Sequence, residues 1–340
     1  MKILPQISVL MPIYNTAPQH LRVAIESILN QTFTNFEFII LNDSPDNRKL
    51  KSIIMEYSDT RIRYEENHKT LGIPKSYNRL VDLSSTNYLA IMNHDDYSFP
   101  NRLQIQYQYL ESHPEVGIVG SGYKKFGEIN RFKKIYPLTN DADIKSMLLF
   151  KSSLHHPTVM MRKNILIENS IRYNENYISL NDRQLYYDIR KYSKLANLSD
   201  ILYKYRFHKN MTSKRKKNII FIEQCEFHNY WFEDNDIDLT PIEKTIFNCY
   251  ASSGRCQIKD FETLEQVKNV LEKISSQSLR RSNIPQPEFA KICANYLLKR
   301  MLNAAVYGYI NSDKILQNTT LPIKADTRIK LLNLALKWRN

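Results

Sequence analysis

The first hundred residues of this 340-residue chain alternate apolar runs with segments of helical spacing. Three of the runs are predicted to be strands: Ile7–Ile13, Phe36–Leu41 and Tyr88–Met92. The segments 18–31 and 73–83 repeat apolar residues as helices do. Near-continuous apolar strands that alternate with helices are typical of a parallel sheet covered on both faces. Ligands bind such sheets beyond the carboxyl ends of the strands, so we expect a binding site in the loops 14–18, 42–47 and 93–100.

The pattern changes twice further along the chain. Beyond residue 100, shorter strand-like runs are mixed with helices, and beyond the basic run Lys214–Lys217 only helical segments are predicted. We therefore predict an α/β domain over residues 1–213, with halves at 1–100 and 101–213, and an all-helical region over 214–340.

Glycine and cysteine usage excludes several protein classes. With only 7 glycines, the chain has no GxGxxG and no GxxxxGK[ST] run, so a Walker-type ATPase or a glycine-fingerprint dehydrogenase is not expected. The 4 cysteines lack CxxC spacing and are predicted to be small buried hydrophobes in a reducing compartment. The N-terminus has no signal-peptide pattern and no apolar run reaches about 18 residues, so a cytoplasmic location is expected.

The net charge of +13 is concentrated in the middle of the chain. Residues 101–217 contain 22 lysines and arginines against 10 aspartates and glutamates. Such a field attracts phosphates, anionic lipid headgroups or nucleic acid, and a solvated lysine-rich surface is the alternative interpretation. We expect no nucleic acid as a partner, because no basic-aromatic RNP-like run or zinc finger occurs.

Acidic residues follow the third predicted strand in the run Asn93-His94-Asp95-Asp96. Adjacent carboxylates are costly unless a cation neutralises them. Mg²⁺ typically takes one or two carboxylates together with phosphate oxygens and water. Two aspartates in a loop are, by themselves, more typical of a solvated turn.

Two other polar positions allow both a functional and a structural interpretation. Asp43 follows the second strand, where an aspartate can accept hydrogen bonds from a base or a ribose, or form an Asx turn before Pro45. Asn181-Asp182 opens a predicted helix, where Asp182 would be either a general base or part of an N-cap. Spacing alone favours the N-cap.

Six segments, taken in order, resemble glycosyltransferase family 2, the inverting enzymes of GT-A fold that build bacterial surface polysaccharide or lipopolysaccharide. The segments are SVLMPIYN (8–15), SILNQTFTNFEFIILND (27–43), LGIPKSYNRLV (71–81), YLAIMNHDDYSFPNRLQIQ (88–106), HHPTVMMRK (155–163) and NDRQLYYDIRKYSKLANLSDILYKYRFHKN (181–210). The resemblance covers about residues 6–212. It implies an α/β GT-A fold, a mixed sheet flanked by helices, with a nucleotide-binding half and an acceptor half.

The resemblance also implies roles for individual residues. The donor nucleotide would be bound by Pro12, Tyr14, Asn15, Asp43, Asn78, Asn93, His94, Asp95 and Arg206. Asp182 would be the catalytic base, Asp95 and His208 would hold a divalent cation, Mn²⁺ or Mg²⁺, and His156 and Asp96 would face the acceptor. In an extended segment the side chain of His94 would point away from those of Asn93 and Asp95.

Two positions depart from the family's pattern. Asn93 stands where the DXD motif usually begins with Asp, and an amide brings no charge, so we expect weaker metal binding. Asn181 stands where Glu usually precedes the base. We therefore expect a less elevated pKa for Asp182, because the like charge beside it is missing.

The resemblance implies a glycosyltransferase of the hexosyltransferase type. Its donor would be a nucleotide-diphosphate sugar, with UDP as the expected nucleotide, and its acceptor a hydroxyl of a glycan or a lipid-linked oligosaccharide. A catalytically silent sugar-nucleotide binder is an alternative, because Asn93 and Asn181 replace acidic residues. A nucleotidyltransferase is a weaker one, since it would need a glycine-rich basic loop where Tyr14–Pro18 has neither glycine nor lysine.

The last predicted helix, Ile323–Trp338, has an apolar face and several lysines and arginines. That pattern suits a helix on the inner face of the cell membrane, and it suits equally well a helix packed on the protein or on a second copy of the chain.

Overall fold

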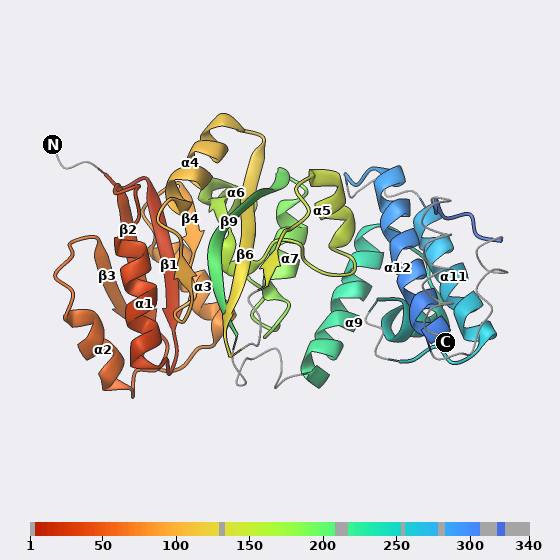
Figure 1. Ribbon diagram of the computed structural model, residues 1–340, viewed down its shortest axis with the longest axis horizontal. Coiled ribbons are helices and arrows are strands. Elements are labelled where there is room, and N and C mark those ends of the chain that lie inside the picture. The colour runs from red at the N-terminus through yellow and green to blue at the C-terminus, as the bar shows by residue number, and fades with distance from the viewer. Residues whose placement is uncertain are drawn as a thin grey trace. The chain divides into compact units, whose positions relative to one another are not determined.

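The computed structural model describes residues 4–128, 133–207, 217–252, 256–277, 283–306 and 318–323 (Figure 1). The chain divides into two compact units. One consists of residues 1–144 and 152–223, and the other of residues 145–151 and 224–340. The boundary predicted between residues 213 and 214 falls outside the described residues and stays a prediction.

A nine-stranded sheet forms the centre of the first unit, in the order β3-β2-β1-β4-β8-β6-β9-β5, with β7 paired to β6. Its parallel half contains β1 (Ile7–Ile13), β2 (Phe36–Asn42), β3 (Ile62–Glu66) and β4 (Tyr88–Ile91). Every residue of β4 is buried, and so are all but one residue in each of β1 and β2. This burial accounts for the near-continuous apolar runs in the sequence. The helices α1 (Pro18–Leu29), α2 (Arg48–Met55) and α3 (Ile73–Leu83) connect these strands.

The second half of the sheet has mixed strand directions. Its strands are β5 (Tyr97–Ser98), β6 (Val116–Gly127), β7 (Lys134–Ile135), β8 (Met160–Arg162) and β9 (Lys194–Phe207). β8 is antiparallel to both β4 and β6, whereas β9 is parallel to β6 and antiparallel to β5. The helices of this half are α4 (Arg102–Ser112), α5 (Asp141–Met147), η1 (His156–Thr158), α6 (Lys163–Glu168) and α7 (Asn181–Ile189).

β6 is longer than the sequence pattern indicates. The pattern predicts separate strands over 116–121 and 124–136, yet one strand of 12 residues runs through Gly122. A Cβ at Gly122 would lie 3.1 Å from the carbonyl oxygens of both Asp200 and Ile135, so glycine allows the three backbones to approach here. The strand predicted over 157–161 also differs, because a 3₁₀ turn precedes β8.

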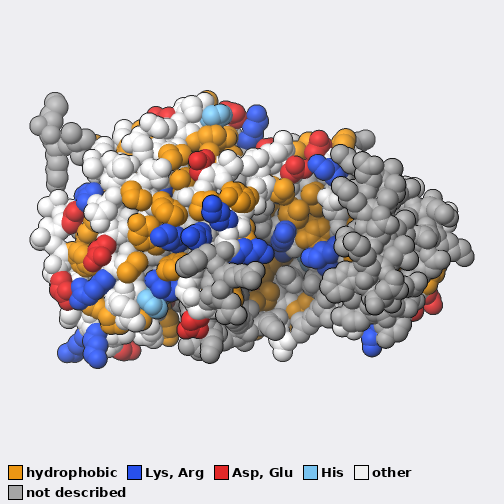
Figure 2. All heavy atoms as spheres, in the orientation of Figure 1, with side chains coloured by type: hydrophobic (Ala, Val, Ile, Leu, Met, Phe, Trp, Pro, Cys, Tyr) orange, Lys and Arg blue, Asp and Glu red, His pale blue; other side chains and the backbone are white. Residues whose placement is uncertain are grey.

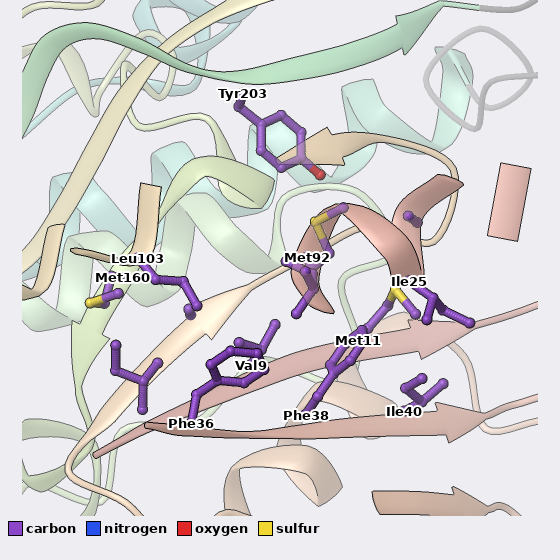
Figure 3. Packing of buried hydrophobic residues seen from close by; sticks show 14 of the residues in the cluster. Val9, Met11, Ile25, Phe36, Phe38, Ile40, Met92, Leu103, Met160 and Tyr203 are labelled. Atoms are coloured by element: carbon purple, nitrogen blue, oxygen red, sulfur yellow. The ribbon is translucent and has the colours of Figure 1, made fainter. Parts of the chain in front are cut away.

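The core of the first unit lies between the sheet and its helices. In Figure 3, Val9 and Met11 of β1, Phe36, Phe38 and Ile40 of β2, Ile25 of α1, Leu103 of α4 and Met160 of β8 converge, with the ring of Tyr203 reaching toward them from β9. All of these side chains are at most 3% exposed. The same core therefore joins the parallel half of the sheet to the mixed half.

The second unit has only helices among the residues that the structure describes. They are α9 (Lys217–Asp234), α10 (Pro241–Ile246), η2 (Phe247–Ser252), α11 (Phe261–Ser276) and α12 (Gln286–Val306). Residues 217–223 of α9 belong to the first unit, and residues 145–147 of α5 belong to the second. A capping box of Thr240 and Glu243 begins α10, and Trp231 stacks on Phe289 in the core. The predicted helical region is confirmed.

Within the described part of the chain, no helix is long and apolar enough to cross a membrane. The predicted amphipathic helix over 323–338 lies almost wholly outside the described residues.

Candidate functional site

The loops after β1, β2 and β4 meet at one edge of the sheet. The Asp43 N–H donates to the Ile13 carbonyl at 2.9 Å, and the Asn15 N–H donates to Ser44 Oγ at 3.1 Å. Thr16 Oγ1 lies 2.8 Å from His94 Nδ1. The structure thus brings together the three loops in which the sequence predicts a binding site.

Residues predicted to line the nucleobase pocket surround the end of β1. Tyr14 is 52% exposed, so its ring is open to a ligand, and Pro12 is half-buried. Asn15 has a φ of 44°, a left-handed conformation that asparagine tolerates better than most residues. Its Oδ1 accepts a hydrogen bond from Asn47 Nδ2 at 3.2 Å, which links the loops after β1 and β2.

Asp43 is buried and anchors the segment that leads into α3. Its carboxylate accepts hydrogen bonds from Asn67 Nδ2 at 2.6 Å, from the Leu71 N–H at 2.7 Å and from the Gly72 N–H at 2.9 Å. The Asx turn considered for Asp43 is formed by Asn42 instead, whose Oδ1 accepts from the Ser44 N–H at 3.0 Å. Three of the hydrogen-bonding positions of this carboxylate are therefore filled from within the protein.

We expect Asp43→Ala to lower the free energy of unfolding by about 2–4 kcal/mol, because three donors lose their acceptor in a buried place. Urea denaturation followed by far-ultraviolet circular dichroism measures this change. Asp46→Ala is the matched control, since Asp46 is exposed on the same loop and should change stability by less than about 0.5 kcal/mol. Equal effects of the two substitutions would contradict an anchoring role for Asp43.

Asp96 organises the loop after β4. It is fully buried and accepts hydrogen bonds from the Arg206 N–H at 2.6 Å, Asn93 Nδ2 at 2.9 Å and the Tyr203 hydroxyl at 3.0 Å. Burial, and next the nearby charge of Asp95, raises the pKa of Asp96 well above its usual range. Asp96 is predicted to face the acceptor, but the structure places it inside the protein. The Asn93 amide points toward it.

Asp95 is the more accessible carboxylate of this loop, and it is only partly buried. Arg206 Nε donates to the Asp95 carbonyl at 2.6 Å, and the guanidinium lies 4.3 Å from the centre of the Phe126 ring. Burial lowers the pKa of Arg206, while the charges of Asp95 and Asp96 oppose that shift. Arg206 therefore supplies a positive charge at the edge where Asp95 is accessible.

The acidic pair fits a divalent cation. Burial and the charge of Asp95 make ionisation of Asp96 costly, and a cation held by the partly buried Asp95 would lower that cost. One carboxylate with phosphate oxygens and water is a usual Mg²⁺ shell. Across the described ranges, no group of three or more His, Cys, Asp or Glu side chains could hold a metal by itself. The other predicted ligand, His208, lies outside the described residues.

Asp182 lies in the first turn of α7 and is not its N-cap. The N-cap is Leu180, and the Asn181 amide donates to the carbonyls of Tyr177 and Ile178 at 3.3 and 3.2 Å. Asp182 Oδ1 accepts from the Arg183 N–H at 2.7 Å. Burial raises the pKa of Asp182 to about 6 even without an acidic neighbour at position 181, so desolvation is the largest cause.

Glu223, which the sequence pattern does not single out, fixes the turn that leads to Asp182. Its carboxylate is 3% exposed and accepts from the N–H groups of Ile178 at 2.6 Å, Ser179 at 2.9 Å and Leu180 at 3.1 Å. These N–H groups precede the first turn of α7, so a side chain from α9 sets where that helix begins.

His156 and Asn78 both contact Tyr173. His156 Nε2 lies 3.0 Å from the Tyr173 hydroxyl, and burial lowers the pKa of His156 to about 3. Asn78 Oδ1 accepts from the Tyr173 N–H at 2.9 Å, and its Nδ2 donates to the Tyr173 carbonyl at 3.0 Å. Both side chains are therefore engaged within the protein, and His156 is neutral at physiological pH.

Tyr77 is a buried phenol near several of the predicted site residues. It is 2% exposed, and its ring centre lies 4.7 Å from that of His156. Burial raises the pKa of Tyr77, and the charges of Asp96, Asp182 and Asp95 raise it further, in that order. The carboxylates predicted from segments about 90 residues apart are thus close enough to act on one phenol.

Comparisons with known proteins identify the family and the fold. The model of the family described as glycosyl transferase family 2 matches residues 8–170. An uncharacterised glycosyltransferase of Methanocaldococcus jannaschii is 33% identical over 224 residues, which are 64% of this chain and 77% of that protein. The O-antigen biosynthesis glycosyltransferase WbnJ of Escherichia coli is 30% identical over 223 residues, which are 63% of this chain and 84% of WbnJ.

Among solved structures, residues 1–349 of Staphylococcus aureus TarS in complex with UDP-GlcNAc are similar, with a TM-score of 0.59. The two chains are 16% identical, and the match covers 92% of each. The predicted GT-A fold, a mixed sheet flanked by helices, is confirmed by this likeness and by the strand order. The chain belongs to glycosyltransferase family 2 and is a glycosyltransferase.

Proposed function

We propose that the enzyme transfers a sugar from a UDP-sugar to a hydroxyl of a glycan or a lipid-linked oligosaccharide, with inversion, in bacterial surface polysaccharide synthesis. The observation that carries this proposal is the environment of the buried Tyr77 phenol, whose pKa is raised by burial and further by the charges of Asp96, Asp182 and Asp95, so that a candidate donor anchor and a candidate base act on the same group. The relatives that act in O-antigen and amylovoran biosynthesis, and the UDP-GlcNAc complex of TarS, support the substrate class.

On the donor side, Tyr14 and Asn15 would contact the base, and Asp95 would face the diphosphate. A divalent cation held by Asp95, with His208 as a second ligand, would supply positive charge for the phosphate oxygens. Arg206 is placed to add a fixed positive charge at the same edge, because it donates to the Asp95 carbonyl. Asp96 would keep this loop in shape rather than bind substrate, since its carboxylate is buried and hydrogen-bonded to three donors.

On the acceptor side, Asp182 would accept the proton of the attacking hydroxyl. A carboxylate with a pKa of about 6 is ionised at neutral pH and is a stronger base than an ordinary aspartate. The attacking oxygen forms a bond to the anomeric carbon as the bond to the diphosphate breaks. A single displacement on one face inverts the configuration of that carbon.

The silent-binder alternative rests on Asn93 and Asn181, and both amides have structural partners. Asn93 donates to Asp96, and Asn181 donates to two carbonyls before α7. These partners account for amides at the two positions, while Asp95 and Asp182 keep the carboxylates that transfer needs. This arrangement favours an active enzyme.

A panel of nucleotide sugars tests the proposal. We expect one UDP-sugar to be hydrolysed slowly when Mn²⁺ is present, and to be turned over faster when an acceptor glycan is added. Chromatography of the released nucleoside diphosphate measures both rates. A GDP-sugar used in preference to every UDP-sugar would contradict the nucleotide assignment. Tight donor binding without any product would favour the silent binder.

A further inference from the structure

Three lysines lie side by side across the mixed half of the sheet. Lys124 of β6 is in register with Lys134 of β7 on one side and with Lys204 of β9 on the other. Residues in direct register project to the same face of a sheet. We call Lys134, Lys124 and Lys204 the lysine row.

Like charges directly opposite each other repel, so an anion bound across the lysine row would lower the cost of aligning the three side chains. In the part of the chain that the structure describes, neither Lys134 nor Lys204 has an acidic ion-pair partner. Lys134 is exposed, and Lys124 and Lys204 are partly exposed, so an external anion can reach all three. A solvated surface would tolerate the lysine row, but solvation alone does not require the three lysines to be aligned.

Aromatic side chains border the lysine row. Tyr97 of β5 is in register with Lys204, whose Nζ lies 4.5 Å from the Tyr97 ring centre and 5.1 Å from that of Phe99. Tyr136, two residues beyond Lys134, is 62% exposed. Figure 2 shows Lys and Arg side chains gathered over β6, β7 and β9, next to hydrophobic side chains. Tyrosine beside basic residues is typical of surfaces that contact lipid headgroups.

The width of the row favours a surface of many anions over one bound phosphate. Neighbouring strands are about 4.8 Å apart, so three lysines span about 10 Å. We propose that the lysine row docks the enzyme on a bilayer that contains anionic lipids. This inference stands apart from the proposed transfer, because docking requires neither a donor nor Asp182.

The row also leads toward the candidate site. Lys204 and Arg206 lie two residues apart on β9 and so project to the same face, and Arg206 donates to the Asp95 carbonyl. A bilayer on the lysine row would therefore lie near the edge of the sheet that carries Asp95. An acceptor attached to a lipid would be concentrated at that edge.

Vesicle flotation tests the docking. We expect the full-length protein to float with vesicles of phosphatidylcholine and phosphatidylglycerol but not with phosphatidylcholine alone, and to be released by high salt. Replacing Lys124, Lys134 and Lys204 by Gln together should weaken this binding on the order of 100-fold. The matched control replaces Arg48, Lys49 and Lys51 of α2 by Gln. They are exposed, carry the same total charge and adjoin β3 at the opposite end of the sheet.

Three outcomes would overturn the proposal. One is a wild-type protein that does not bind anionic vesicles. Another is an equal loss of vesicle binding in the two triple variants, which would show that only net charge matters. The third is a labelled oligonucleotide or inorganic pyrophosphate that binds the row more tightly than the vesicles do. Donor hydrolysis in detergent-free buffer should be unchanged in the lysine-row variant, which separates a failure of docking from a failure of the proposed function.

Discussion

Asp182→Asn is expected to lower kcat for sugar transfer on the order of 10²- to 10⁴-fold while the donor still binds. The amide keeps the shape of the side chain and its contact with the Arg183 N–H, but it cannot accept the proton of the attacking hydroxyl. Single-turnover transfer measures the chemical step, and calorimetric titration with UDP measures donor binding. Asp82→Asn is the control, because Asp82 forms an exposed ion pair with Arg172 and should leave both quantities unchanged.

The same substitution should stabilise the protein above pH 6. A carboxyl whose pKa rises from 3.8 to about 6 on folding is ionised at a cost of up to about 3 kcal/mol. This cost is absent below pH 3.8, where the group is protonated in both states, and it is complete above pH 6. Asp182→Asn should therefore raise the free energy of unfolding at pH 7.5 but not at pH 3.5.

Activity and stability of the wild type thus depend on pH in opposite directions through Asp182. Transfer should rise as pH increases through about 6, because the base must be ionised. A pH profile of kcat that lacks this limb, or normal turnover by Asp182→Asn, would refute its assignment as the base. If the variant and the wild type instead had the same free energy of unfolding at pH 7.5 as well as at pH 3.5, the burial argument would be refuted.

Asp95→Asn is expected to reduce kcat/KM on the order of 10²- to 10³-fold and to weaken Mn²⁺ binding in the presence of UDP. Asp95 is the accessible carboxylate of its loop, since Asp96 is buried and Asn93 carries no charge. Electron paramagnetic resonance of Mn²⁺ measures binding without relying on turnover. Asp46→Asn, on the neighbouring exposed loop, is the control.

Asn93→Asp provides the reverse test. Adding a carboxylate at the first position of the motif should tighten Mn²⁺ binding by about 10-fold, because ligand charge strengthens binding of hard cations. It should also destabilise the metal-free protein, because the amide that donates to the Asp96 carboxylate is lost and two carboxyl groups then face each other. Mn²⁺ affinity that is unchanged in both Asp95→Asn and Asn93→Asp would place the metal elsewhere.

The parallel half of the sheet could be predicted from sequence because each strand carries its own signal. β1, β2 and β4 are buried on both faces, and their apolar runs show this without reference to neighbours. β5 has two residues and depends on pairing with β9, so no local pattern reveals it. The continuity of β6 through Gly122 depends likewise on how closely β7 and β9 approach.

The candidate site could be predicted as a set of positions but not as a network. Ordered motifs indicate Asp43, Asp95 and Asp182, because the resemblance depends on residue type and order. Their partners are a different matter, since two of the three donors to Asp43 are backbone N–H groups 28 and 29 residues away. No side-chain pattern identifies a backbone donor, so the anchoring role of Asp43 emerges only from three-dimensional structure.

Glu223 has a practical consequence for any attempt to isolate a minimal catalytic fragment. A fragment ending at residue 213, where the sequence pattern predicts the domain to end, would lack the carboxylate that binds the three N–H groups before α7. In such a fragment, water would have to accept the hydrogen bonds of those N–H groups. The residue at which α7 begins would then no longer be fixed, and Asp182 lies in the first turn of that helix. A fragment can therefore keep the whole sheet and still misplace Asp182, the proposed base, so we expect the shortest active form of the enzyme to extend past Glu223.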